Sequence, residues 1–170
     1  MVLEIDIRIS GEICMQEIDI PGFGLVKLEH LVTDFTGTLS YDGSLLPEVK
    51  ELLNRIARIV KVHVLTADTF GTARAALEGV KCTLTVLTGE DVDKQKEWYV
   101  RDLGQDQVIA IGNGNNDRLM LKAARVGVAV TEKEGCAVAA LSNADIHVNS
   151  ISDGLGLLLN PKRLKATLRT

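Results

Sequence analysis

The segment HLVTDFTGTL, residues 30–39, decides the fold, because a short apolar run there ends in a carboxylate that glycine and hydroxyl residues follow. The run over 31–35 predicts a buried strand, so Asp34 leaves its end at the edge of a sheet. An ionised carboxylate can attack phosphorus and form an acyl phosphate, which makes Asp34 a candidate nucleophile. A lone Asp at a strand end usually caps a turn, but a turn does not require the second threonine of this string.

Further apolar runs follow this segment, and helical patterns separate them. The runs predict buried strands at 60–66, 82–87, 107–112, 126–130 and 144–148, with helices beginning near Pro47, Thr69, Asp91, Asn115 and Glu134. Such alternation is typical of a parallel sheet covered by helices on both faces. We therefore predict an α/β fold, a three-layer, doubly wound (Rossmann-like) parallel sheet.

Residues 2–20 alternate apolar and polar side chains around Ser10-Gly11-Glu12, which predicts an N-terminal β-hairpin that Pro21-Gly22 ends. We treat 1–170 as a single domain, with the hairpin extension at 1–26, the core that carries the site at 27–150 and a C-terminal helix at 151–170. The edges of the hairpin make it a candidate for contacts in a homo-oligomer, and a simple extension of the domain's own surface is an equally good interpretation.

Composition narrows the class of protein. The 19 basic and 23 acidic side chains give a net charge of −4, which does not favour binding to nucleic acid or to an anionic membrane. Cys14, Cys82 and Cys136 form no Cys-x-x-Cys pair, which argues against a disulfide framework and a structural zinc site. Neither a secretory leader nor an apolar run long enough to cross a bilayer is recognisable, so we expect a cytoplasmic protein.

Polar residues follow several of the predicted strands, and the carboxyl ends of parallel strands meet at one edge of the sheet. The backbone N–H groups of Gly37 and Thr38 can turn toward an anion beside Asp34. The Thr66 hydroxyl and the N–H of Ala67 can donate to a phosphoryl oxygen. A threonine at this position is also a common helix cap, so the Thr66 signal is weak alone.

Two lysines compete for the role of a cation at the site. Lys94 lies at the start of a predicted helix, where its charge can neutralise both an attacking carboxylate and a phosphoryl group. Lys96 is a close competitor, and a solvated surface lysine is the plain alternative for either residue.

The string GNGNND, residues 112–117, follows a buried run and brings amide and carboxylate oxygens together. With Asp34 and the carbonyl of Thr36, the side chains of Asn113 and Asp117 could hold one Mg²⁺ ion, which prefers oxygen ligands and retained waters. We place Asn116 among the phosphate-binding residues. A helix-capping turn is the alternative interpretation of this string.

Taken together in this order, the segments around Asp34, Thr66, Lys94 and 112–117 resemble the haloacid dehalogenase superfamily, and in particular the phosphorylation domain of P-type ATPases. The resemblance covers about residues 28–150, and the chain is similar to the stand-alone, soluble P-type ATPase-like hydrolases. It implies that Asp34 is phosphorylated, that Thr66 and Lys94 bind the phosphoryl group and that Asp117 belongs to the magnesium site. The implied activity is hydrolysis of a phosphorylated small molecule or macromolecule by a phosphatase or an ATPase-like enzyme.

Two positions depart from the phosphatases of this superfamily. Thr36 stands where they carry a general acid–base Asp, whose loss typically costs about 100-fold to 10,000-fold in rate. Slow turnover with an accumulating aspartyl phosphate is therefore expected. Asn113 replaces an Asp that contacts magnesium, so we expect weakened magnesium affinity, with Asp117 binding the ion more directly.

No cap domain is expected, because only 27 residues separate Thr38 from Thr66 and the same number separates Thr66 from Lys94. The segment 38–46, with Asp42-Gly43 as its turn, can form only a small flap. An open site leaves a second class of function, a weak phosphoacceptor or a module that binds magnesium or phosphate without turnover. A receiver-type phosphoacceptor fits less well, since its acidic cluster would precede the acceptor strand.

Overall fold

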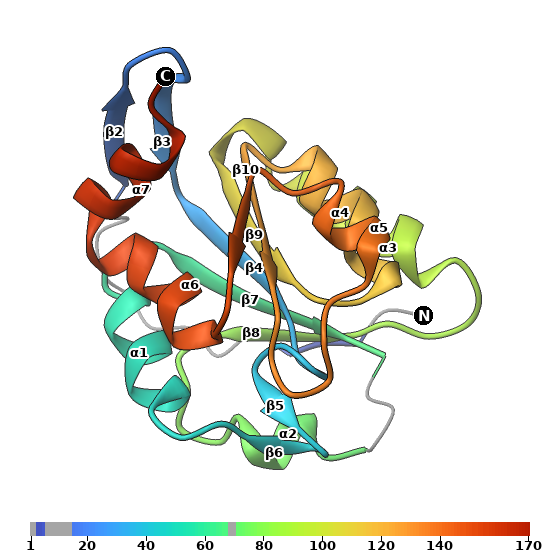
Figure 1. Ribbon diagram of the computed structural model, residues 1–170. Coiled ribbons are helices and arrows are strands. Elements are labelled where there is room, and N and C mark those ends of the chain that lie inside the picture. The colour runs from blue at the N-terminus through green and yellow to red at the C-terminus, as the bar shows by residue number, and fades with distance from the viewer. Residues whose placement is uncertain (1–2, 6–14, 68–70) are drawn as a thin grey trace.

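A twisted sheet forms the centre of the protein in a computed structural model that describes residues 3–5, 15–67 and 71–170 (Figure 1). Its strand order is β1-β8-β7-β4-β9-β10-β11; the six strands from β8 to β11 are parallel, and β1 pairs antiparallel with β8. The strands are β1 (Leu3–Ile5), β4 (His30–Asp34), β7 (Lys61–Thr66), β8 (Thr83–Val86), β9 (Val108–Gly112), β10 (Val126–Val130) and β11 (Ile146–Val148).

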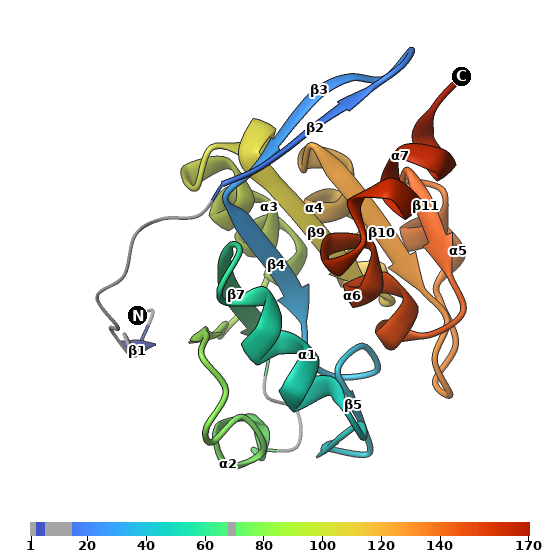
Figure 2. The same cartoon turned by 90° about the vertical axis from the view of Figure 1, so that its left-hand side faces the viewer.

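Helices cover both faces of this sheet, as Figures 1 and 2 show. On one side lie α1 (Val49–Ile56) and α6 (Ile151–Leu159), which pack on each other; on the other lie α3 (Val92–Asp102), α4 (Arg118–Ala123) and α5 (Val138–Leu141). Two separate apolar cores fill the layers, one containing Leu53 and Leu158 and the other Val100 and Met120. The three-layer α/β fold predicted from the sequence is confirmed.

All six parallel strands lie within two residues of their predicted bounds. The reason is physical: a strand covered on both faces needs apolar side chains at consecutive positions, and β9 and β10 are buried along their whole length. The start predicted near Thr69 lies outside the described residues, and one helical turn, α2 (Ala73–Ala76), follows it. Short 3₁₀ segments, η1 (Gln105–Gln107) and η2 (Asn115–Asp117), precede β9 and α4.

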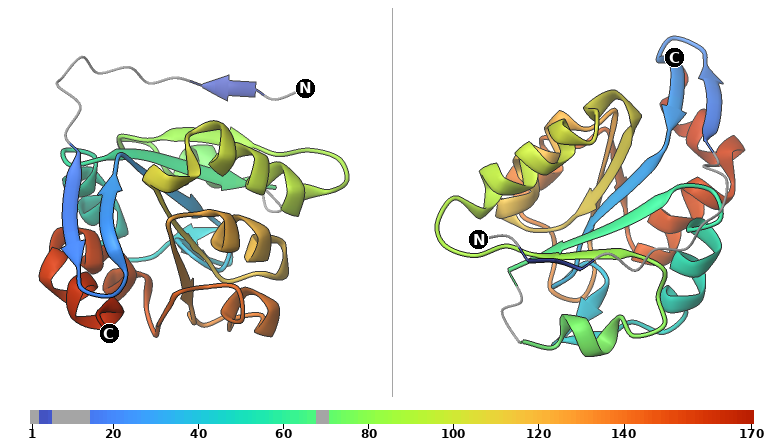
Figure 3. Two further views of the ribbon diagram at one scale, coloured as in Figure 1. Left: turned by 90° about the horizontal axis from the view of Figure 1, so that it is seen from above. Right: turned by 180° about the vertical axis from the view of Figure 1, so that it is seen from behind.

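The N-terminal hairpin is present, but it lies later in the sequence than predicted. It consists of β2 (Gln16–Ile20) and β3 (Gly24–Leu28), and Pro21-Gly22 forms its turn instead of ending it. The strand before it, β1, pairs with β8, and the predicted turn at Ser10-Gly11-Glu12 lies outside the described residues. The hairpin rests against α7 (Pro161–Leu168), where the backbone N–H of Thr170 donates to the carbonyl of Pro21 at 3.1 Å (Figure 3).

The single C-terminal helix predicted over 151–170 is wrong in one respect, because the chain breaks into α6 and α7 at Asn160. Pro161 cannot donate the backbone hydrogen bond that a continuous helix needs, and it disfavours helical geometry in the residue before it. Asn160 accordingly has φ −134° and ψ 76°. Pro161 then starts α7 at a position where its missing N–H has no cost.

A small flap follows β4, as predicted. Its strands are β5 (Ser40–Tyr41) and β6 (Ser44–Leu45), joined by Asp42 and Gly43 with φ 49° and 78°. Two consecutive residues with positive φ match the two-residue hairpin turn in which Asp-Gly is favoured. In the described part of the chain, only this flap and helix α1 separate β4 from β7, so no cap domain is inserted there.

The direction in which successive strands are added to the sheet reverses beside β4. From this strand the chain first adds β7 and β8 on one side, and it then crosses to β9, β10 and β11 on the other. Ligands of open parallel sheets bind at the carboxyl ends of strands where the order reverses. Asp34 is the last residue of β4, and Asn113 directly follows β9, the neighbouring strand on the other side of this point.

Among the helices of the described residues, none has the length and apolar character needed to cross a membrane.

Candidate active site

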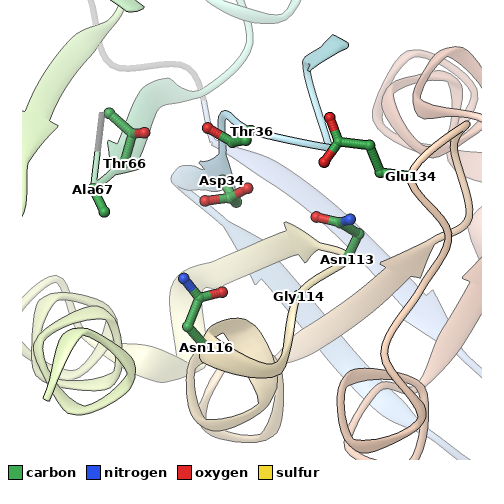
Figure 4. Close-up of a pocket in the computed structure, with 8 residues that line it drawn as sticks. All are labelled: Asp34, Thr36, Thr66, Ala67, Asn113, Gly114, Asn116 and Glu134. Atoms are coloured by element: carbon green, nitrogen blue, oxygen red, sulfur yellow. The ribbon is translucent and has the colours of Figure 1, made fainter. Parts of the chain in front are cut away.

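A small pocket of about 200 Å³ opens at the carboxyl ends of the central strands. The described residues that line it come from the ends of β4 and β7 and from the loops after β4, β7, β9 and β10, and Figure 4 shows them around a common space (Figure 4). They are Asp34, Thr36, Thr66, Ala67, Asn113, Gly114, Asn116 and Glu134. Its volume suits a phosphoryl group and a metal ion better than a drug-sized molecule, which needs roughly 300 Å³ or more.

A buried lysine holds two carboxylates at the base of this pocket. The Nζ atom of Lys96 donates to Oδ1 of Asp34 at 2.6 Å and to Oδ1 of Asp117 at 2.7 Å. The side chains of Lys96 and Asp117 are wholly buried, and that of Asp34 is 7% exposed. Of these three side chains, Asp34 therefore reaches the pocket, and Lys96 and Asp117 lie behind it.

Burial dominates the electrostatics of Asp34. The pKa of its carboxyl is raised from 3.8 to about 7: burial is the largest cause, the Asp117 carboxylate adds to the rise, and the Lys96 ammonium opposes it. Burial by itself would lower the pKa of Lys96, but the two carboxylates outweigh it and raise that pKa. The lysine thus remains a cation, and positive charge near Asp34 favours its ionised, nucleophilic form.

The lysine predicted for this position was Lys94, and the structure places Lys96 there instead. The Lys94 side chain is 51% exposed and pairs with Asp91 at 3.1 Å on the surface of α3. Each helical residue advances the side-chain direction by about 100°, so a difference of two positions turns a side chain to about the opposite face. In α3, which begins at Val92, Lys96 is buried and faces the sheet.

Asp117 lies behind the pocket and is not among the residues that line it. Its second oxygen, Oδ2, accepts the backbone N–H groups of Asn113 at 3.0 Å and Gly114 at 2.8 Å, while Oδ1 accepts from Lys96. The carboxylate therefore fixes the 112–117 loop and the lysine. This arrangement does not favour the expectation that Asp117 contacts the metal more directly.

The N–H groups of Gly37 and Thr38, predicted to face an anion, are used within their own turn. The N–H of Gly37 donates to the Ser40 carbonyl at 3.0 Å, and the N–H of Thr38 donates to the Phe35 carbonyl at 3.4 Å. The Thr38 hydroxyl donates to Oδ1 of Asn113 at 3.1 Å. These residues shape the loop after β4 and tie it to the loop after β9.

Four other predicted residues do meet at the pocket. Thr36, Thr66, Ala67 and Asn116 all line it, although they come from three separate loops. Thr66 is 1% exposed at the end of β7, and Asn116 lies at the start of the α4 region. Their hydroxyl, backbone and amide groups are of the kind that bind phosphoryl oxygens.

The oxygen donors at the pocket fit a hard divalent cation. Asp34, Thr36 and Asn113 bring carboxylate, carbonyl and amide oxygens to the pocket, which are ligands that Mg²⁺ accepts. Oδ1 of Asn113 accepts one hydrogen bond from Thr38 and retains a second lone pair. Within the described ranges, no three His, Cys, Asp or Glu side chains cluster closely enough to hold a metal by themselves. A cation here would therefore depend on neutral oxygens and water as well as on carboxylate.

Two groups that contribute to the site were not predicted from the sequence. The backbone N–H of Phe35 donates to the carboxylate of Asp34, and Glu134 reaches the pocket from the loop after β10. The signal for Glu134 was its place beyond the end of a predicted strand at the same sheet edge. No pattern of spacing links it to the other segments.

Comparison with known proteins agrees with this geometry. The sequence profile of haloacid dehalogenase-like hydrolases matches residues 96–154. An uncharacterised protein of Methanocaldococcus jannaschii is 52% identical over 63 residues, which cover 37% of this chain and 68% of that protein.

Two characterised relatives match longer segments at lower identity. The zinc-transporting ATPase of Bacillus subtilis is 30% identical over 131 residues, 75% of this chain and 20% of the ATPase. The phosphoserine phosphatase of Lactococcus lactis is 32% identical over 84 residues, 49% of this chain and 39% of the phosphatase. The chain thus spans less than half the length of either relative.

Solved structures share the fold at low identity. A hydrolase of the haloacid dehalogenase superfamily, subfamily IIIA, from Legionella pneumophila superposes with a TM-score of 0.66 at 18% identity, covering 83% of this chain and 87% of that one. The 3-deoxy-D-manno-octulosonate 8-phosphate phosphatase of Moraxella catarrhalis, solved with magnesium, phosphate and sugar, gives 0.63 at 15% identity, covering 84% and 94%.

Proposed function

The chain belongs to the haloacid dehalogenase-like hydrolases, and we propose that it hydrolyses phosphate esters or anhydrides in a magnesium-dependent reaction through a covalent phosphate on Asp34. The observation that carries this proposal is the position of Asp34. Its carboxylate faces the pocket at the end of β4 and accepts a hydrogen bond from a buried cation, Lys96.

The residues of the pocket have separate tasks in this reaction. Asp34 attacks the phosphorus atom, and the leaving group departs on the opposite side. Lys96 offsets the negative charge of both Asp34 and the phosphoryl group, while Thr66, Ala67 and Asn116 bind the phosphoryl oxygens. Water then attacks the acyl phosphate and regenerates the Asp34 carboxylate.

We propose that Asp34, Thr36 and Asn113 hold a Mg²⁺ ion. When bound, this cation would neutralise phosphoryl charge and help to position the phosphate. Because Asn113 is neutral, we expect magnesium to bind more weakly than at a site with a carboxylate in that position.

Slow turnover is the kinetic expectation. Thr36 has no ionisable side chain at neutral pH, so the position after Asp34 and Phe35 offers no group that exchanges a proton with the leaving oxygen or with water. The acyl phosphate on Asp34 is therefore expected to accumulate during turnover.

Two similar proteins support a proposal for the class of substrate. The names of two similar proteins specify small phosphorylated molecules, phosphoserine and 3-deoxy-D-manno-octulosonate 8-phosphate. We propose that this chain also acts on a small phosphorylated molecule. A cytoplasmic setting is our further proposal, since Cys82 and Cys136 are free thiols.

Hydrolysis assays test the proposal. Purified protein is incubated with p-nitrophenyl phosphate, acetyl phosphate or ATP over a range of magnesium concentrations, and released phosphate is measured. We expect multiple turnovers that depend on magnesium and disappear in Asp34→Asn. Turnover that survives in Asp34→Asn would contradict the proposal.

A second candidate is a module that accepts or binds phosphate without appreciable turnover. Thr36 and Asn113 favour it, because each removes a carboxylate that the phosphatases of the superfamily use. In the same assay this module would release at most one phosphate for each chain.

A further inference from the structure

Among the described residues that line the pocket, two carry an ionisable side chain. They are Asp34 and Glu134, and the other six are threonine, alanine, asparagine or glycine. If Asp34 becomes phosphorylated, its carboxylate cannot exchange a proton at the same time. Within the described part of the lining, Glu134 is then the side chain that remains to serve as a general acid or base.

The carboxylate of Glu134 lies beside the position that lacks such a group. A Cβ atom added to Gly37, the residue after Thr36, would lie 2.8 Å from Oε2 of Glu134 and 2.6 Å from Nδ2 of Asn113. Gly37, with φ 76°, thus leaves the space in which the glutamate and the amide approach the loop after β4. Figure 4 shows Glu134 beside Asn113, with its carboxylate extended toward the side of the pocket on which Thr36 lies.

A turn after β10 holds Glu134 in this place. The N–H of Gly135 donates to the carbonyl of Glu132 at 2.9 Å, which closes the turn. Nδ2 of Asn113 donates to the carbonyl of Gly135 at 3.0 Å, and the N–H of Ala137 donates to the carbonyl of Asn113 at 2.8 Å.

Asn113 makes a hydrogen bond in this turn that an ionised aspartate could not make. An ionised carboxylate has no N–H to donate to the Gly135 carbonyl. The amide at position 113 therefore ties the turn that carries Glu134 to the end of β9.

We propose that Glu134 is the general acid–base residue of this site and supplies, from the loop after β10, the function that Thr36 cannot. The inference rests on the proposed function. In the first step Asp34 attacks phosphorus, the bond between phosphorus and the leaving oxygen breaks, and protonated Glu134 gives its proton to that oxygen. In the second step Glu134 takes a proton from the attacking water as the bond from phosphorus to Asp34 breaks, releasing inorganic phosphate.

Glu134 is exposed at the mouth of the pocket, so it can exchange protons with solvent between turnovers. Glu134 lies on a surface turn and not on the strand end that carries the nucleophile. We therefore expect slower proton transfer than from the aspartate that phosphatases of the superfamily carry at the position of Thr36. The residual turnover expected from this chain is therefore assigned to Glu134.

Rapid-quench measurements on the full chain test the proposal. Phosphorylation and dephosphorylation of Asp34 are followed by intact mass, with acetyl phosphate or phenyl phosphate as donor. In Glu134→Gln we expect hydrolysis of the adduct to slow by about 100-fold or more. Formation of the adduct from acetyl phosphate should change little, because acetate leaves as a stable anion, whereas formation from phenyl phosphate should slow.

The matched control is Glu51→Gln, which removes the same charge from an exposed site on α1 and should leave both steps unchanged. The thermal unfolding midpoint of Glu134→Gln should equal that of the natural chain, which separates lost chemistry from lost structure. Unchanged adduct hydrolysis in Glu134→Gln would overturn this inference alone. Failure of the natural chain to form any adduct would overturn the proposed function as well.

Discussion

At the scale of single residues, the site depends on which lysine lies between Asp34 and Asp117. The sequence predicted a cation at the start of the helix after β8, but not which of Lys94 and Lys96 it was. That choice depends on the rotation of α3 about its axis, and helix boundaries read from a sequence are uncertain by more than the two positions at issue. Asp34, Thr36 and Thr66 could be found because strand ends, unlike helix faces, are marked directly by the end of an apolar run.

The two lysines give a matched pair of variants. Lys96→Met removes the charge that offsets Asp34 and leaves Asp34 and Asp117 without their shared buried cation, so formation of the acyl phosphate should fall by about 100-fold or more. Lys94→Met removes an equal charge from the exposed surface of the same helix and should leave the rate unchanged. The measurement is the initial rate of adduct formation from acetyl phosphate. Equal losses in the two variants would contradict the assignment of Lys96.

At the scale of elements, the parallel strands were predictable and the ends of the chain were not. The core strands carry the signal of double burial, whereas alternation in residues 2–28 fits several pairings equally well. Alternating patterns specify which face of a strand is buried but not which strand is its partner. In the structure Ile18, Ile20, Val26 and Leu28 bury one face of the β2–β3 hairpin.

The packing of α4 against β10 provides a stability prediction. A Cβ atom at Gly127 would lie 2.3 Å from the backbone oxygen of Leu121, so the helix and the strand approach each other too closely for any side chain. We expect Gly127→Ala to lower the free energy of unfolding by about 1–3 kcal/mol or more, because backbone must move to relieve the clash. Urea denaturation measures this change.

Gly154→Ala is the control for that experiment. A Cβ atom at Gly154, in α6, meets its nearest neighbour at an ordinary 3.4 Å, and alanine favours the helix by about 1 kcal/mol over glycine. This variant should therefore be neutral or more stable than the natural chain. A comparable loss of stability in both variants would show that the Gly127 contact is not specific.

At the scale of the whole molecule, the division into one domain over 1–170 and the proposed homo-oligomer stay predictions. The hairpin whose edges suggested oligomer contacts packs one face into the core and contacts α7.

A network of buried polar groups joins distant elements, and it could not be predicted from the sequence. His30 and His63 lie in adjacent strands, with Nδ1 of His30 3.0 Å from Nε2 of His63, and Nδ1 of His63 is 2.9 Å from the Tyr99 hydroxyl on α3.

The pH dependence of stability tests this network. Burial first, and then the charges of His30 and Lys61, lower the pKa of His63 to about 4, against 6.5 for an unperturbed histidine. Between these values the unfolded chain binds the additional proton, so the contribution of His63 is present above pH 6.5 and is lost as pH falls toward 4. The loss between pH 7 and pH 5 should be about 2 kcal/mol.

Asp34 titrates in the same range with the opposite sign. Its raised pKa gives a contribution that is present below 3.8 and lost as pH rises toward about 7, so the two groups partly cancel in the natural chain. The informative quantity is the stability of the natural chain minus that of His63→Gln, measured by urea denaturation at each pH. This difference should fall by about 2 kcal/mol from pH 7 to pH 5, and a constant difference would contradict the neutral, buried state of His63.

Mapping the modified residue shows whether Asp34 takes up a phosphoryl group. The protein is incubated with acetyl phosphate and magnesium, quenched in acid, digested and analysed by mass spectrometry. We expect one added phosphoryl group, which is located on Asp34 and is absent from Asp34→Asn. A natural chain that remains unmodified, or a phosphoryl group that persists in Asp34→Asn, would contradict it.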